Sequence, residues 1–186
     1  MWSNPLCITT TKRTLTFKNE CDYRVILTAI KILNDPDLLE HDKYSCLCEC
    51  VFKEKVEPCE YGEVIPAVYQ IIDTTYGDEY VPSSKGEKNA PKLMDWEKDF
   101  RYIAPPISRV LGYDVRSSRV THWYAFVGAY MEIGSCFFSE IVAVRRKLAY
   151  HEPLDESDRK FYSENHSIIN MDESSPFDDE FLKGGF

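Results

Sequence analysis

Between Asp95 and Leu148 the sequence repeats apolar residues every three or four positions, with breaks near Gly112 and Gly134. This spacing places apolar side chains on one face of an α-helix, and glycine is common just after a helix ends. The first stretch has apolar residues at Trp96, Phe100, Ile103, Ile107 and Val110. Asp95 precedes it as a predicted cap, and Pro105-Pro106 predicts a kink or a restart of that helix.

Two further helices are predicted after Gly112, joined by a short turn. The first takes Ser117 or Ser118 as its cap and ends at Gly134, and the second is capped by Ser135. Their apolar faces comprise Trp123, Phe126, Val127, Tyr130 and Ile133, then Phe138, Ile141, Val142, Arg145 and Leu148. Three helices joined by short turns are typical of a compact helical subassembly.

The rest of the chain adds a hairpin and more helices. Short β-prone runs at 6–9 and 14–17 predict an N-terminal hairpin, and a helix is expected from a cap at Asn19 to Asn34. Residues 43–55 fit a helical stripe and also alternate like a strand, and helix is favoured. Another helix is expected from Glu63 or Ile65 to Gly77, with Pro66 in its first turn, and a short one after Pro153.

The predicted fold class is mainly α. We expect one compact domain of about five to seven helices over residues 1–167, with the hairpin in 1–18 and an exposed loop at 78–94. Residues 168–186 alternate acidic clusters with single phenylalanines and lack a sustained period, so a flexible, disordered acidic tail is expected there.

Charge is placed unevenly along the chain. The net charge is −9, and residues 151–186 hold ten acidic against three basic residues. A general nucleic-acid binder carries a basic surface, so nucleic acid is excluded as a partner and proteins are expected. No apolar run has the roughly 20 residues of a membrane span, and the N-terminus lacks the pattern of a signal peptide. We therefore expect a cytoplasmic protein without membrane contact.

Seven cysteines raise the question of metal binding. Cys46, Cys48, Cys50 and Cys59 lie close in sequence, with His41 nearby. Zinc ligands normally come in pairs two to four residues apart within a tight turn, whereas alternate positions diverge on a helix or a strand. Reduced, buried thiols are favoured over a zinc site, and neither a metal nor a cofactor is expected.

Catalytic motifs are absent from the sequence. His122 and Cys136 are a conceivable base and nucleophile, but nothing in the pattern orients them. Asp95 and Asp99 are better explained by the positive end of the helix dipole than as metal ligands. With no glycine-rich phosphate loop and no G-x-S-x-G or H-E-x-x-H motif, the chain is not expected to be an enzyme.

Aromatic residues are dense in the same block and are expected mainly in the core. They are Trp96, Phe100, Tyr102, Tyr113, Trp123, Tyr124, Phe126 and Tyr130. Trp123, Tyr124 and Phe126 span most of a helical turn, so one or two rings should remain at a surface groove that suits a protein partner.

Four short segments carry a resemblance to a known family. They are D-W-E-K-D-F-R-Y-I from Asp95, L-G-Y-D-V from Leu111, T-H-W-Y-A-F-V-G-A-Y from Thr121 and I-V-A-V-R-R from Ile141. The chain resembles the bacteriophage Gp-fifteen family of siphophages and prophages of Gram-positive hosts. The matching positions are Asp95, Trp96, Asp99, Tyr102, Ile103, Gly112 to Val115, His122, Trp123, Phe126, Ile141, Val144 and Arg145. A weaker likeness reaches back to Phe17, while Pro105-Pro106, the cysteine-rich segment 46–59 and the acidic tail depart from the family pattern.

The resemblance implies a tail assembly chaperone of the host bacterial cytoplasm, absent from the mature virion. Such proteins are encoded before the tape-measure gene, coat the tape-measure protein and recruit tail-tube subunits, and self-association is a further expectation. The alternative is a structural minor tail or head–tail connector protein that stays in the virion. The expected partner-binding or scaffold residues are Trp96, Phe100, Tyr102, His122, Trp123 and Tyr124.

Overall fold

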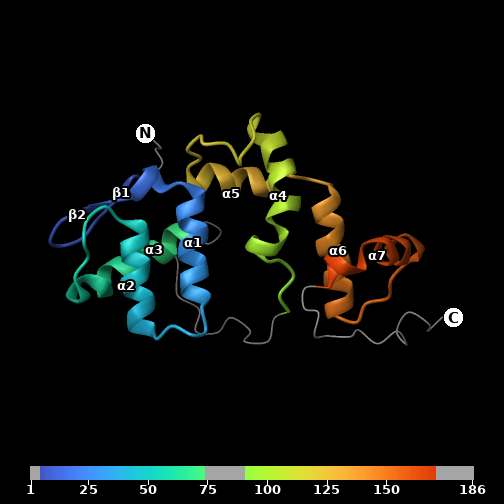
Figure 1. The fold of residues 1–186 in the computed structure, drawn as a ribbon, viewed down its shortest axis with the longest axis horizontal. Helices are drawn as coiled ribbons and strands as arrows, with labels where there is room; N and C mark the ends of the chain where they lie inside the picture. Colours follow the sequence, from blue (N-terminus) through green and yellow to red (C-terminus); the bar gives the residue numbers. More distant parts are fainter. Residues whose placement is uncertain (1–4, 74–90, 171–186) are drawn as a thin grey trace.

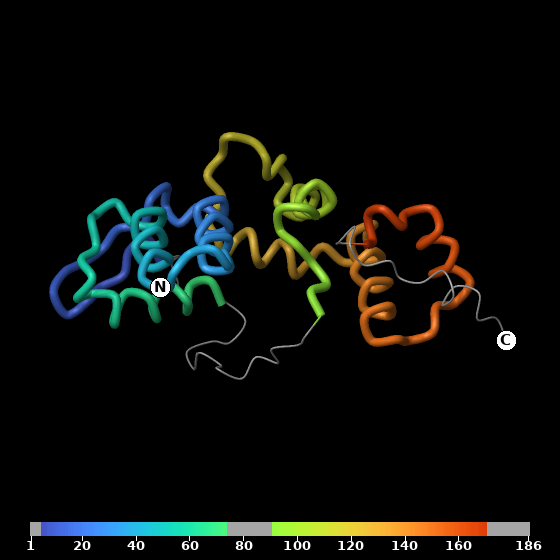
Figure 2. The backbone as a smooth tube through the Cα atoms, turned by 60° about the horizontal axis from the view of Figure 1, so that its bottom comes forward, coloured from blue at the N-terminus to red at the C-terminus, as the bar shows by residue number. Residues whose placement is uncertain are grey.

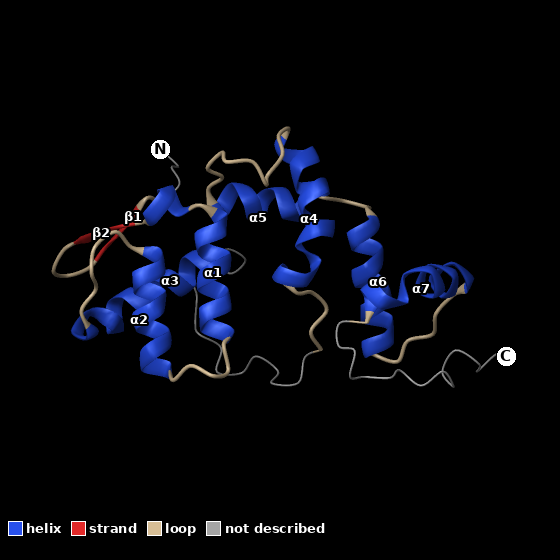
Figure 3. Cartoon of the chain, in the orientation of Figure 1, coloured by secondary structure: helices blue, strands red, loops and turns tan. Residues whose placement is uncertain are grey.

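The computed structural model describes residues 5–73 and 91–170, and helices dominate this part of the chain (Figures 1 and 3). The strands are β1 (Cys7–Thr9) and β2 (Thr14–Thr16), and two short 3-10 helices are η1 (Lys18–Cys21) and η2 (Pro58–Glu60). The α-helices are α1 (Tyr23–Asn34), α2 (Glu40–Val51), α3 (Tyr61–Ile72), α4 (Trp96–Leu111), α5 (Trp123–Met131), α6 (Phe137–Ala149) and α7 (Glu156–Ile169). The predicted mainly α class with an N-terminal hairpin is confirmed.

The hairpin is held by the segment around η2. Its strands pair antiparallel with Ile8 opposite Leu15, whose side chain is fully buried. The backbone N–H and hydroxyl of Thr11 in the turn both donate to Glu63, and Arg13 donates to both carboxylate oxygens of Glu60 at 2.8 and 3.1 Å. Strands of three residues are too short to be stable alone, so these contacts and the burial of Leu15 fix the hairpin.

Helix α1 is capped by Asp22, whereas the sequence had predicted Asn19 as its cap. The Asp22 carboxylate accepts from the backbone N–H of Arg24 at 3.0 Å and from that of Thr121 at 2.8 Å. Asn19 lies in the left-handed region (φ 48°) within η1 and cannot begin a right-handed helix there. The cap of α1 is therefore set by a contact with a distant segment.

The helix favoured over a strand for residues 43–55 is confirmed as α2. Helix α3 begins at Tyr61, earlier than predicted, because η2 leads directly into it. Pro66 consequently lies inside the helix and not in its first turn. The helix ends at Ile72, so Gly77 is not its stop. Gly77 and most of the loop predicted at 78–94 lie outside the described residues, while residues 91–94 lead into α4 without regular secondary structure.

Helix α4 runs as one piece through Pro105 and Pro106, so the predicted restart does not occur. Proline lacks an N–H, which leaves the carbonyls of Arg101 and Tyr102 without their usual backbone donors. Burial of Pro106 with Ile103 and Ile107 keeps this stretch against the core. As predicted, Asp95 caps the helix and Gly112 ends it, with a φ of 76° that favours glycine.

The caps of α5 and α6 differ from those predicted. His122 caps α5, because its Nδ1 accepts from the backbone N–H of Tyr124 at 3.1 Å, while Ser117 and Ser118 lie in an exposed turn. Helix α5 ends at Met131, three residues before Gly134. Cys136, not Ser135, precedes α6, and its backbone N–H donates to the Ser139 hydroxyl at 2.8 Å.

The helices form an elongated row with two cores. The hairpin and α1–α3 lie at one end, α4 and α5 in the middle, and α6 with α7 at the other end (Figures 1 and 2). The larger core spans the hairpin to the start of α6. The smaller core comprises Ile141, Val144, Leu148, Leu154, Tyr162 and Ile169. The side chain of Tyr102 packs against both cores.

Helix α7 extends to Ile169, so residues 168 and 169, assigned to the tail from the sequence, belong to a helix and Ile169 is buried. Residues 171–186 of that tail lie outside the described residues. No helix in residues 5–73 and 91–170 is long and apolar enough to span a membrane.

Candidate functional site

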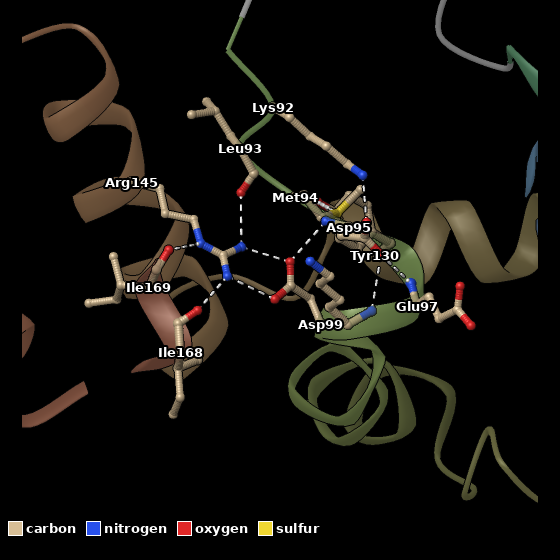
Figure 4. Close-up of polar contacts among 11 residues, drawn as sticks. Lys92, Leu93, Met94, Asp95, Glu97, Asp99, Tyr130, Arg145, Ile168 and Ile169 are labelled. Atoms are coloured by element: carbon tan, nitrogen blue, oxygen red, sulfur yellow. Dashed lines mark hydrogen bonds and ion pairs between the residues drawn. The ribbon is translucent and has the colours of Figure 1, made fainter. Parts of the chain in front are cut away.

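A buried ion pair joins α4 to α6. The guanidinium of Arg145 donates from Nη1 to Asp99 Oδ2 at 2.7 Å and from Nη2 to Asp99 Oδ1 at 3.0 Å (Figure 4). Both side chains are nearly inaccessible, with exposed fractions of 6% for Arg145 and 2% for Asp99. The two-pronged geometry suits the planar guanidinium and fixes the relative position of the two helices.

Three backbone carbonyls complete the surroundings of Arg145. Its remaining hydrogen bonds go to Leu93 O at 3.1 Å, Ile168 O at 2.6 Å and Ile169 O at 2.8 Å (Figure 4). The carbonyls come from the segment before α4 and from the C-terminal end of α7, where the helix dipole favours a cation. We call Asp99, Arg145 and these three carbonyls the Arg145 hub.

The start of α4 is linked to the hub through Asp95. Its backbone N–H donates to Asp99 Oδ2 at 2.9 Å, and its own carboxylate accepts from the N–H groups of Glu97 and Lys98. Burial opposes ionisation of Asp95, but hydrogen bonds from Lys92 and from these two N–H groups outweigh it and lower its pKa to about 2. Asp95 is thus a charged cap at neutral pH.

Trp96 and Phe100, two of the aromatic residues predicted as partner-binding, lie at the boundary of the larger core, and Trp123 lies inside it. Trp96 contacts Phe126 and Tyr130, with ring centroids 5.8 and 5.2 Å away, and Phe100 stacks on Tyr23 at 6.1 Å. Trp123 is only 3% exposed, and its indole N–H has no hydrogen-bond partner among residues 5–73 and 91–170. Trp123 is therefore a core residue that supports α5 and presents no surface to a partner.

His122 and Tyr124 hold the start of α5. Their rings meet edge to face at 5.3 Å, and His122 Nε2 lies 3.1 Å from the carbonyl of Pro5. His122 thus ties α5 to the chain before β1. His122 and Cys136 each cap a separate helix, and His122 uses both ring nitrogens for structural contacts.

Tyr102, the remaining predicted residue, belongs to an aromatic strip that crosses three helices. Its ring lies 5.6 Å from that of Phe137 on α6, which lies 5.5 Å from that of Phe161 on α7. Phe137 is 43% exposed. The guanidinium of Arg101 lies over the Tyr102 ring at 4.7 Å. Phe137 and Phe161 were not singled out from the sequence, because only the packing of α4, α6 and α7 brings them together.

The cysteines are dispersed. Cys48 and Cys21 are buried, and desolvation raises the pKa of Cys48 to about 11 and that of Cys21 to about 12, so both stay protonated thiols. Cys46 and Cys59 are exposed, and Lys12 Nζ lies 3.2 Å from Cys59 Sγ. Within residues 5–73 and 91–170 no three His, Cys, Asp or Glu side chains are placed to hold a metal ion.

Comparisons with known proteins add no further constraint on this site: no family model, no curated protein and no solved structure matches the chain.

Proposed function

We propose that the chain is a phage tail assembly chaperone that binds the tape-measure protein and helps to recruit tail-tube subunits. The Arg145 hub is the observation that supports the proposal. Asp99 comes from the first segment of the Gp-fifteen resemblance and Arg145 from the last, and their side chains meet at 2.7 Å. If the chain shares the fold of that family, some matching residues that are far apart in sequence should contact one another, as Asp99 and Arg145 do.

Other matching positions have structural roles between these two segments. Asp95 caps α4, Gly112 ends it, His122 caps α5 and Phe126 is fully buried. The resemblance therefore falls on residues that determine how α4, α5 and α6 pack. This supports a common architecture, and the chaperone role follows from the architecture only as an implication of the resemblance.

The shape and charge of the chain suit such a role. A tape-measure protein is a long helical chain, and a helix is commonly bound by an apolar groove between helices. The aromatic strip of Tyr102, Phe137 and Phe161 offers such a helix aromatic rings from α4, α6 and α7. Residues 1–150 hold 19 basic against 21 acidic residues, so this body carries little net charge to repel a partner.

Co-expression with the tape-measure protein encoded beside it tests the proposal. We expect a soluble complex that co-purifies, with less tape-measure protein in the pellet than when it is expressed alone. Phe137→Ser should weaken this effect, whereas Tyr150→Ser should not, because Tyr150 is 54% exposed but lies outside the strip. Equal solubility of the tape-measure protein with and without the chain would refute the chaperone role.

Mass spectrometry of purified virions separates the chaperone from the alternative, a minor tail or head–tail connector protein. An assembly chaperone leaves before the particle is finished, so its peptides should be missing from virions that contain the tail-tube protein. Stoichiometric recovery of the chain from virions would instead establish a structural component.

A further inference from the structure

The aromatic strip has an exposed central ring, and the guanidinium of Arg101 lies over one end of it. Phe137 is 43% exposed, although aromatic side chains of this size usually bury most of their surface. Arg101 stacks over Tyr102 at one end, and Arg159 and Lys160 precede Phe161 at the other. Within residues 5–73 and 91–170, none of these three cations forms an ion pair. The strip therefore suits a ligand that combines aromatic side chains with carboxylates.

Residues 171–186 of the same chain have that chemistry. Their sequence, MDESSPFDDEFLKGGF, contains five carboxylates against one lysine, and three phenylalanines separate or follow the acidic clusters. Phe177 is followed directly by Asp178 and Asp179, and Glu180 precedes Phe181. Each phenylalanine in the acidic part thus has a neighbouring carboxylate that can meet a cation beside the strip.

The chain leaves α7 close enough to reach the strip. Phe161 and Ile169 are eight residues apart on α7, about 12 Å for an unbroken helix, and the backbone kinks between them at Asn165 (φ −129°, ψ 18°). Phe177 is seven residues beyond Asn170, a span of up to roughly 23–25 Å when extended. The side chains of Ile168, Phe161 and Tyr102 also pack against the same smaller core. The connection is therefore longer than the distance it has to cover.

We propose that the segment 171–186 docks on its own chain, with a phenylalanine of the Phe177–Phe181 stretch on the strip of Tyr102, Phe137 and Phe161 and a neighbouring carboxylate on Arg101. The occupant is the chain's own segment and not that of a second copy, because the short span from Asn170 gives it a high effective concentration. The strip is the same surface that the proposed function assigns to the tape-measure protein. The docking is tested in the isolated chain, so its failure leaves the proposed function untouched.

Photo-cross-linking in the full chain tests the docking. Phe137→p-benzoylphenylalanine places a photoreactive ring in the strip, and Tyr150→p-benzoylphenylalanine places the same group at an exposed site outside it. After irradiation of an equal mixture of isotopically heavy and light chains, digestion and mass spectrometry identify the linked peptides. We expect the Phe137 variant to link to peptides within 171–186 of the same chain, several-fold more than the Tyr150 variant does.

Charge provides a second arm of the test. Asp178→Asn, Asp179→Asn and Glu180→Gln combined should lower the Phe137 cross-link several-fold, as should added salt, because exposed charges are screened by ions. If the Phe137 variant does not fold, Phe161→p-benzoylphenylalanine replaces it and places the photoreactive ring at the α7 end of the same strip. Links between heavy and light chains would show docking between copies. Equal yields from Phe137 and Tyr150 would show no docking. Either result overturns the proposal.

Discussion

At the scale of single residues, Arg145 carries a charge in a place that water barely reaches. Its five N–H groups each make a hydrogen bond, to Asp99 and to the carbonyls of Leu93, Ile168 and Ile169. A buried ion pair contributes little net stability over apolar residues of the same shape, but loss of one partner leaves a buried charge without compensation. The hub therefore specifies how α4, α6 and α7 are arranged.

Arg145→Met should lower the free energy of unfolding by about 3–5 kcal/mol, because the buried Asp99 carboxyl would lose its cationic partner and keep one backbone N–H donor. Urea unfolding followed by circular dichroism measures this. Lys31→Met is the matched control, since Lys31 and Glu97 form a pair with exposed fractions of 68% and 72%, and solvent screens such exposed pairs. Similar losses in the two variants would show that the hub is energetically unimportant.

Asp95 links stability to pH. Its pKa in the folded chain is about 2, below the ordinary 3.8, so its cap is fully stabilising above the ordinary value and is lost as the pH falls toward 2. Asp95→Ala should cost about 1–2 kcal/mol at pH 7. The gap between wild type and variant should then shrink as the pH drops from about 4 to about 2. Unfolding curves across this range would contradict the assignment if the gap stayed constant.

At the scale of elements, the sequence predicted most helices but misplaced several of their ends. Apolar spacing depends only on neighbouring residues, so α1, α4, α5 and α6 were found. The caps Asp22 and His122 depend on distant partners, Thr121 for Asp22 and the carbonyl of Pro5 for His122, and local patterns do not contain this information. The same reason explains why Arg145 was placed on one face of a predicted helix and not paired with Asp99.

The end of α7 is one such boundary, and its position changes what a truncation should do. A chain ending at Asn170 keeps every contact of the Arg145 hub, whereas a chain ending at Ser167 loses the carbonyls of Ile168 and Ile169 and the buried Ile169 side chain. We expect the first to retain its stability within about 1 kcal/mol and the second to lose about 2–5 kcal/mol. Thermal melts compare them, and equal melting temperatures would place the helix end before Ile168.

At the scale of the whole molecule, the two cores differ in size, and α6 contributes side chains to both. The larger core contains the buried residues of α1–α5, and the smaller one only six buried residues of α6, α7 and the loop between them. Tyr102 and the Arg145 hub connect them. The aromatic strip lies at this junction, which explains why the apolar faces predicted along single helices contain none of its three rings. Tyr102 alone was singled out, as a member of the aromatic block.

Hydrogen exchange should show this division directly. We expect the amides of α7 to exchange sooner than those of α1, because local opening costs less where fewer apolar side chains are buried. Arg145→Met should accelerate exchange in α7 and leave α1 close to wild type. Uniform protection across α1 and α7, lost together in the variant, would instead indicate one cooperative unit.

The position of Ile169 also sets an order of events during synthesis. Arg145 is translated 24 residues before the last of its hydrogen-bond acceptors. While the ribosome adds those residues, α1–α5 can already pack, because their contacts lie earlier in the chain and domains commonly fold from the N-terminus. Arg145 then lacks two of its carbonyl acceptors, Ile168 O and Ile169 O, until the end of α7 has been made. The Arg145 hub is thus completed late in synthesis, and a nascent chain that stalls before Ile169 still exposes the surface between α4 and α6.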